Sequence, residues 1–160
     1  MTLREAHEGD VEFLQRITQT PGWLANIGPR GTETREGALA YLERSFLTPY
    51  REQGCGLWVI DVDGSAVGLS GIVVRAGVEI PDLGYALLPE FEGQGYATLA
   101  GQKVLEWARN AGRWSTLDAY TMPHNDASGR VLQRLGFTEL GIVHLEAFGG
   151  EPSRHWRNNL

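Results

Sequence analysis

The sequence contains little cysteine, no long apolar run and fewer basic than acidic residues. Its one cysteine, Cys55, has no partner for an intramolecular disulfide, and no cluster of cysteine and histidine suggests a zinc site, so we expect no metal. Twenty acidic against fourteen basic residues give a net charge of −6, which argues against non-specific binding to nucleic acid or acidic membranes. With no apolar segment long enough to span a bilayer and no signal-peptide pattern, we expect a cytoplasmic protein.

Length and pattern indicate one domain that covers residues 1–160. A chain of 160 residues can bury a sizeable core and is too short for two ordinary domains. We find no internal repeat, low-complexity tract or linker. Helical and alternating hydrophobic patterns both occur along the chain, which predicts an α/β or α+β domain.

The first third of the chain is predicted to form a short strand and two helices. Residues 2–6 fit a strand, and an amphipathic helix from Gly9-Asp10 is ended by Thr20-Pro21-Gly22. Residues 23–31 are rich in glycine and proline and are predicted to be a connection. A second helical pattern, with Ala38 and Phe46 on its apolar side, is expected to end at Pro49.

From residue 57 the pattern alternates and predicts strands. Asp63-Gly64 is a strong two-residue hairpin signal between strands over residues 57–62 and 66–74, and residues 78–88 complete an antiparallel meander. Because a helix then separates this meander from the strand over residues 114–121, those two strands can pair in parallel. Residues 137–148 and 154–157 are predicted as the last two strands.

The stretch over residues 86–112 is the most informative part of the chain. An apolar run ends at Pro89, a loop with Gly93 and Gly95 follows, and an amphipathic helix continues to Gly112. Free backbone N–H groups at the start of a helix form an anion site, so a phosphorylated ligand is expected here. The loop matches neither a complete GxGxxG nor the Gly-Lys-Ser/Thr pattern of a nucleotide triphosphatase, and an ordinary glycine-rich connection is the alternative interpretation.

A second motif follows one helix and one strand later. Residues 125–137 read NDASGRVLQRLGF, in which N-x-x-S begins a short helix that ends in L-G-F. Together with E-G-Q-G-Y-A over residues 92–97, this order of motifs resembles the GNAT acetyltransferase superfamily, and within it the ribosomal-protein N-terminal acetyltransferases. The resemblance spans residues 58–148 and is much looser over the first fifty residues.

The resemblance implies a three-layer fold with a mixed, mostly antiparallel, twisted sheet of six to seven strands, about four helices and splayed central strands. It also implies acetyl-CoA as the co-substrate. By motif position, the pyrophosphate would meet the backbone of the loop, the pantetheine arm would pair with Leu87 and Leu88, and Arg134 would reach the nucleotide end. The loop residues concerned are Gly93, Gln94, Gly95, Tyr96 and Ala97. Where the family commonly has Arg or Gln, this chain has Glu92, whose carboxylate is unfavourable beside a pyrophosphate and is expected to point away.

The chemistry that the resemblance implies is attack of a neutral amine on the acetyl carbonyl without a covalent enzyme intermediate. Asp82 and Glu79 are candidates for the base, with Asp82 preferred because it precedes Gly84-Tyr85 as the acidic residue of this branch often does. A water chain is the alternative. Asn125 would hydrogen-bond the cofactor arm, and Ser128 would protonate the leaving thiolate, unless Ser128 only satisfies an N–H group at the helix start.

Recognition of the acceptor is the least defined part of the sequence. Trp23 and Tyr85 are candidates to line the acceptor groove, although buried aromatic packing explains each of them equally well. We therefore predict an N-acetyltransferase whose acceptor is a protein α-amine or a small-molecule amine. The alternative is a non-catalytic acyl-CoA-binding module on the same fold, and a homodimer is plausible in either case.

Overall fold

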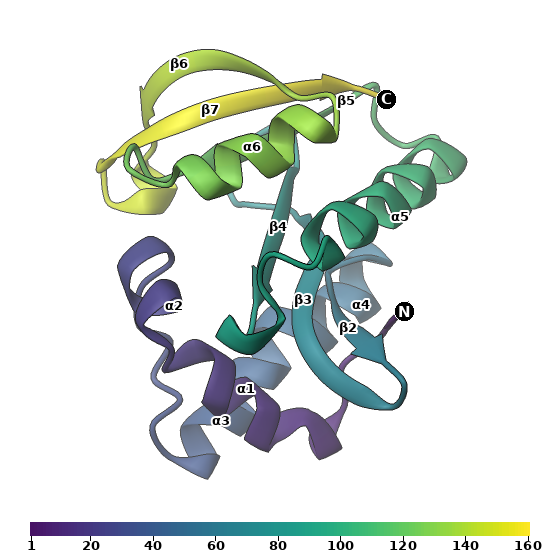
Figure 1. Cartoon of the computed structure of the whole chain (residues 1–160), viewed down its shortest axis with the longest axis vertical. Helices are drawn as coiled ribbons and strands as arrows, with labels where there is room; N and C mark the ends of the chain where they lie inside the picture. Colours follow the sequence, from purple (N-terminus) through teal and green to yellow (C-terminus); the bar gives the residue numbers. More distant parts are fainter.

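A seven-stranded mixed sheet forms the centre of the computed structural model, which describes every residue from 1 to 160 (Figure 1). The strand order is β1-β2-β3-β4-β5-β7-β6, and all neighbours are antiparallel except β4 and β5, which are parallel. The strands are β1 (Thr2–Arg4), β2 (Leu57–Val62), β3 (Ser65–Val73), β4 (Asp82–Leu87), β5 (Thr116–Thr121), β6 (Thr138–His144) and β7 (Pro152–Asn159). The predicted mixed, mostly antiparallel sheet is confirmed.

Helices pack on both faces of the sheet. They are α1 (Val11–Thr18), α2 (Pro21–Asn26), α3 (Arg35–Leu42), α4 (Thr48–Gln53), α5 (Tyr96–Ala111) and α6 (Asp126–Arg134), with short turns η1 (Glu8–Asp10), η2 (Glu43–Leu47), η3 (Pro89–Phe91) and η4 (Glu146–Phe148). Adjacent side chains of a strand point to opposite faces, so Val59 packs with α1 to α3 whereas Ile60 packs with α5. None of the helices combines the length and the apolar character needed to cross a lipid bilayer.

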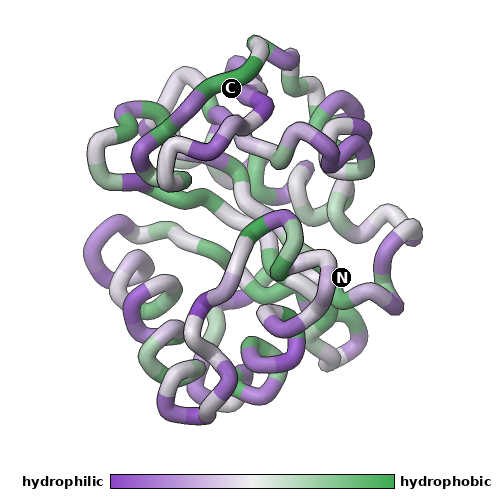
Figure 2. The backbone as a smooth tube through the Cα atoms, turned by 90° about the vertical axis from the view of Figure 1, so that its left-hand side faces the viewer, coloured by the Kyte–Doolittle hydropathy of each residue, from purple (hydrophilic) through white to green (hydrophobic).

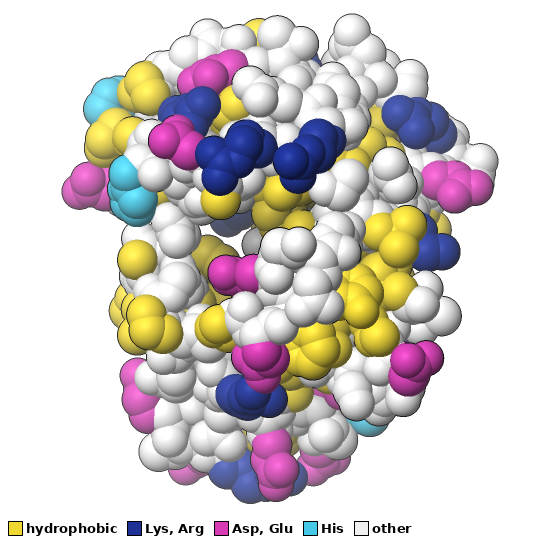
Figure 3. Space-filling view, in the orientation of Figure 1, with side chains coloured by type: hydrophobic (Ala, Val, Ile, Leu, Met, Phe, Trp, Pro, Cys, Tyr) yellow, Lys and Arg dark blue, Asp and Glu magenta, His cyan; other side chains and the backbone are white.

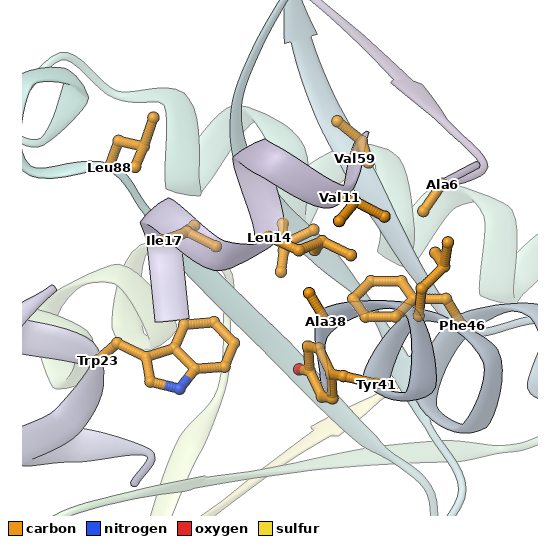
Figure 4. Packing of buried hydrophobic residues seen from close by; sticks show 12 residues of the cluster. Ala6, Val11, Leu14, Ile17, Trp23, Ala38, Tyr41, Phe46, Val59 and Leu88 are labelled. Carbon is orange, nitrogen blue, oxygen red and sulfur yellow. The ribbon is translucent and has the colours of Figure 1, made fainter. Parts of the chain in front are cut away.

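Two large apolar clusters make up most of the core. The first joins α1, α2 and α3 to β2 and β3, and Figure 4 shows Leu14, Ile17 and Phe46 converging within it. The second joins α5 and α6 to β4, β5 and β7 around the fully buried Trp156. The apolar segments of the backbone accordingly run through the interior of both halves (Figure 2).

The join between the halves is the weakest part of the sheet. Strands β3 and β4 are paired at six positions, but β4 and β5 are paired only at Asp82 and Asp118. Beyond that position the two strands separate. The expected splayed central strands are therefore confirmed.

Local sequence explains the elements that flank this gap. Asp63 and Gly64 both have positive φ (52° and 85°), the conformation that a tight two-residue hairpin turn requires. On α5, a Cβ atom at Gly101 would lie 2.5 Å from a methyl carbon of Leu135, so glycine at this position favours the close approach of α5 to the C-terminal end of α6. The small residues Ala100, Gly101 and Ala108 of α5 are buried against its neighbours, and Gly112 ends the helix in the left-handed conformation.

Two predictions about the first third of the chain are wrong. The connection predicted over residues 23–31 contains part of α2, because the Thr20 side chain caps this helix and Pro21 lies in its first turn, where its missing N–H group is not needed. Pro49 does not end a helix either. It lies in the first turn of α4, and the π-helical turn η2 joins α3 to α4 without a break. The chain consequently has five helical segments rather than about four.

Strand boundaries differ from the prediction in the second half. Strand β4 begins at Asp82 rather than at residue 78, and β7 has eight residues, Pro152–Asn159, rather than four. Strand β6 pairs only with β7, and its register shifts between Glu139 and Gly141. That irregularity makes β6 a bulged edge strand.

Gly71 of β3 tests the packing beside the gap. A Cβ atom at this position would lie 2.0 Å from the main-chain oxygen of Gly56, a backbone atom that cannot move freely. We expect Gly71→Ala to lower the free energy of unfolding by about 2 kcal/mol or more, measured by urea denaturation. Gly22→Ala is the control, because no atom lies within 4 Å of a Cβ there; we expect that variant to be neutral or up to about 1 kcal/mol more stable. Equal stability of the two variants would contradict the packing described.

Candidate active site

A cleft of about 1200 Å³ opens where β4 and β5 separate. Its walls come from both halves of the molecule: α2, the π turn η2 and β3 on one side, and β5, α6 and the loop between β6 and β7 on the other. Figure 3 shows the hollow between these two halves of the molecule. The splayed strands thus create a space large enough for an extended ligand.

The edge of β4 that faces the gap offers unpaired main-chain groups. Main-chain groups of an antiparallel strand alternate in direction, and the N–H of Leu88 donates to the carbonyl of Val67 on the β3 side. The groups of Tyr85 and Leu87 therefore face the gap. The carbonyl of Leu88 accepts from the N–H of Phe91, so the expectation that Leu88 pairs with a ligand is not met.

The glycine loop and the N-terminus of α5 lie at one end of the cleft. Gly93 and Gly95 have φ of 73° and 85°, and a Cβ built on either meets no atom within 4 Å. The first amide groups of a helix have no partner within the helix, and no side chain caps those of α5. Open space beside free amides at a helix N-terminus fits the diphosphate expected there. Glu92 is exposed and also lines the cleft.

Basic side chains lie near this end of the cleft. Arg130 and Arg134 are exposed and four residues apart on α6, so they share one face of the helix. Figure 3 shows two Lys or Arg side chains side by side over α6, above the hollow. Arg130 was not among the residues predicted from the sequence. Its four-residue spacing from Arg134 was the signal that could have placed both on one face of the helix.

Tyr85 and Ser128 meet across the cleft. The Tyr85 hydroxyl lies 2.6 Å from Oγ of Ser128 and donates to the main-chain oxygen of Ser128 at 3.0 Å. Asn125 caps α6, since its Oδ1 accepts from the N–H of Ser128 at 3.2 Å. Burial raises the pKa of Tyr85 to about 12, so the phenol remains a proton donor at neutral pH. All three residues line the cleft.

Asp82 lines the same cleft but is held by Arg75. The Arg75 guanidinium donates to both carboxylate oxygens of Asp82, at 2.7 and 3.0 Å, and the carboxylate is almost completely buried. Burial raises the pKa of Asp82, and Arg75 opposes this shift. Arg75 also stacks over Phe148, 4.6 Å from the ring centre. The Arg75 side chain thus connects Asp82, at the start of β4, to Phe148 in the loop between β6 and β7.

A second buried carboxylate lies beside Asp82 on β5. Asp118 accepts hydrogen bonds from Arg157 at 2.7 and 2.9 Å and contacts Nε2 of His155 at 2.7 Å. Burial raises the pKa of Asp118, but these bonds outweigh that effect and hold the pKa below its ordinary value. Tyr120 stacks on His155 and lines the cleft. No group of three or more His, Cys, Asp and Glu side chains is arranged to hold a metal ion.

Glu79 lies away from these residues. It is exposed in the segment before β4 and lines a separate small pocket with Arg113 and Trp114. The alternative assignment of the base to Glu79 therefore has no support from its position. Instead, the cleft contains a carboxylate that the sequence analysis did not single out, Glu151, which follows η4.

Trp23 is 5% exposed and its indole Nε1 donates to the main-chain oxygen of Gly28 at 2.9 Å. It contributes to both the first core cluster and the cleft wall. The structure therefore combines the two interpretations of this residue. Tyr85 also lines the cleft, but its hydroxyl is directed to Ser128.

The chain matches a known family model over most of its length. The model described as an acetyltransferase (GNAT) domain matches residues 1–138. A curated relative, an uncharacterized N-acetyltransferase called YoaA from Bacillus subtilis strain 168, is 24% identical over 146 residues, which cover 89% of this chain and 82% of the relative.

Solved structures share the whole fold. An acetyltransferase from Agrobacterium tumefaciens strain C58 has a TM-score of 0.82 and 24% identity, with 99% of this chain and 90% of that chain covered. The ribosomal L7/L12 α-N-protein acetyltransferase RimL, solved in complex with coenzyme A, has a TM-score of 0.84 and 18% identity, with coverage of 99% and 93%. At these identities the structural likeness shows the fold.

Proposed function

The chain belongs to the GNAT family of acetyltransferases and uses acetyl-CoA as its acetyl donor, and we propose that it acetylates a primary amine by direct attack in a ternary complex. One observation carries this proposal. The unpaired edge of β4, the glycine loop at α5 and the Tyr85–Ser128 pair all line a single cleft. A long ligand with a diphosphate at one end and a reactive group near its other end matches that arrangement.

The donor's thioester supplies an activated acetyl group, and the protein's part is to bind and orient it. Free amides from Gly93 to Ala97 would bind the diphosphate, with Arg130 and Arg134 near the nucleotide end. Main-chain groups of Leu87 and Tyr85 would pair with the pantetheine arm, as a neighbouring strand does. A free β4 amide would also polarise the acetyl carbonyl, where negative charge develops during attack.

Ser128 and Tyr85 would act together on the leaving thiolate. The Tyr85 hydrogen is directed to Oγ or to the main-chain oxygen of Ser128. When it points to Oγ, the serine hydroxyl is free to donate to the sulfur. In this assignment Ser128 is the proton donor and Tyr85 is a positioning residue, which replaces our expectation that Tyr85 binds the acceptor. Asn125 holds the backbone of Ser128 in place.

Two carboxylates of the cleft are candidates to accept the amine proton. Asp82 remains the preferred base because it lies at the last paired position before β4 and β5 separate. Since Arg75 occupies both of its oxygens, proton transfer would run through water or require movement of Arg75. Glu151 has no ion-pair partner and lies on the opposite wall, which makes it the alternative.

The first test of the proposed function is a calorimetric titration with acetyl-CoA, with dephospho-CoA and ATP as comparison ligands. We expect micromolar binding of acetyl-CoA, which corresponds to about 8 kcal/mol, and much weaker binding of ATP. Gly95→Asp, which adds a charge where the diphosphate would lie, is expected to weaken binding by at least about tenfold. Gly112→Asp is the matched control, because Gly112 also has positive φ and open space but lies at the far end of α5. Equal effects of both variants would remove the loop from the site.

A second prediction concerns the proton donor. Ser128→Ala is expected to lower kcat about a hundredfold, within the usual range for a lost general acid, while the KM for acetyl-CoA changes little. Tyr85→Phe should lower kcat by a smaller factor, about tenfold, and Ser128→Thr should retain most activity. The measurement is release of the CoA thiol with a panel of amines and peptides. Tyr120→Phe removes a cleft hydroxyl that does not contact Ser128 and serves as the control. Unchanged kcat in Ser128→Ala would leave this serine a structural role, and binding without turnover would favour a non-catalytic module.

A third prediction separates the two candidate bases. A base acts in its deprotonated form, and burial raises the pKa of Asp82, so kcat/KM of the wild type should fall as the pH drops through that pKa. We expect Asp82→Asn to lower kcat/KM about a hundredfold and to remove this acidic limb. In Glu151→Gln, kcat/KM should still fall at acidic pH as it does in the wild type. Thermal melting checks that each variant is folded. The opposite pattern would assign the proton transfer to Glu151.

A further inference from the structure

Two arginines with no ionic partner lie at the end of the cleft away from the glycine loop. The ion pairs that arginines form with carboxylates in this protein involve Arg4, Arg16, Arg51, Arg75, Arg154 and Arg157. Arg30, between α2 and α3, and Arg44, in the π turn η2, form none, yet both line the cleft. Two positive charges therefore face this space uncompensated.

The Arg44 side chain contacts the main chain of Arg30. Nη2 of Arg44 donates to the main-chain oxygen of Arg30 at 2.7 Å, and the Arg44 guanidinium lies 5.3 Å from the ring centre of Tyr41. Nη1 of Arg30 donates to the main-chain oxygens of Pro29 and Gly28 at 3.1 and 3.4 Å. Main-chain oxygens thus hold both side chains in place, and neither guanidinium group is paired with a carboxylate.

The position of Arg44 depends on the π turn. A π turn places one extra residue in a helical turn and so rotates the side chains that follow relative to a regular α-helix, and such turns are frequent at functional sites. Here the residues of that turn include Arg44 and Ser45, both of which line the cleft. The irregularity of the helix thus falls on the residues that face the ligand space.

The other charged residues of the cleft do not neutralise these arginines. Asp82 is paired with Arg75, and Glu92 lies next to the glycine loop at the donor end. Glu151 follows η4, in the loop that faces α2 across the gap in Figure 1. An acceptor between α2 and that loop would meet a free carboxylate on one side and two free guanidinium groups on the other.

Exposed apolar side chains also line the cleft. Leu24 and Ile27 of the α2 region and Val74 after β3 are 43%, 39% and 39% exposed, and all three line the cleft. They are half of the large hydrophobic side chains exposed in the protein, the others being Leu99, Leu140 and Ile142. Exposed apolar groups gathered in a cleft indicate a partly apolar ligand.

We propose that the acceptor is a primary amine on an apolar body that also carries a carboxylate or phosphate, and that Arg30 and Arg44 bind this anionic group. Guanidinium groups match both anions in geometry and charge. This inference rests on the proposed acetyltransferase function. The net charge of the chain is −6, so this preference would come from the arginines of the cleft and not from the overall charge.

The experiment compares acceptors with and without one negative charge. The probes are the tripeptide amides Ala-Phe-Asp and Ala-Phe-Asn for a peptide acceptor, and phenylalanine and phenylalaninamide for a small one. One of these two pairs represents the true acceptor. For that pair we expect the wild type to have a KM about tenfold lower for the acidic compound than for its amide. Arg44→Gln should bring that ratio close to one, and Arg44→Lys should keep part of it. Arg35→Gln is the matched control, because Arg35 is an exposed arginine without an ion pair on the same helical stretch and lies outside the cleft lining.

A second readout needs no turnover. Calorimetric binding of the N-acetylated forms of the same four compounds should show the same charge preference and the same loss in Arg44→Gln. Preference in binding without any acetyl transfer would uphold the anion site and refute the proposed activity. Equal KM values and equal binding of acidic and amide members in both arms, or a preference that survives Arg44→Gln, would overturn the inference.

Discussion

The rest of the structure depends on the failure of β4 and β5 to pair beyond one position. An unpaired edge inside a sheet exposes N–H and C=O groups that must find partners, because a buried polar main-chain group without a hydrogen bond costs about 1 to 3 kcal/mol. Here the edge opens into a cleft, where an extended ligand can satisfy these groups. The cleft and the free main-chain groups that line it both follow from that gap.

The polar groups around the gap fall into two kinds. Some are satisfied by the protein itself, such as Asp82 with Arg75 and Asp118 with Arg157 and His155, and these fix the strands where they begin to separate. Others keep unused donors or charge, notably the amides of the glycine loop and the guanidinium groups of Arg30 and Arg44, which form no ion pair. The distinction divides the residues that shape the cleft from those that are available to a ligand.

Much of this arrangement was predictable from local sequence. The Asp63-Gly64 turn, the small residues of α5 and the two motifs at residues 92–97 and 125–137 each encode their structure within a few residues. The failures have a common cause in long-range geometry. The direction of the Leu88 main chain depends on its register with β3, and the pairing of Arg75 with Asp82 depends on the path of an irregular segment. The helix α2 was missed because proline and glycine were interpreted as breakers, although Thr20 caps the turn that they begin.

The two outer edges of the sheet restrict how the protein can meet another copy of itself. At one edge β1 has only three residues, and at the other the register shift between Glu139 and Gly141 bends β6 away from a straight course. Neither edge therefore presents a long, even row of free main-chain donors and acceptors that a second chain could extend. Continuous growth of the sheet from molecule to molecule is disfavoured at both ends, and any self-association would have to be specified by side chains.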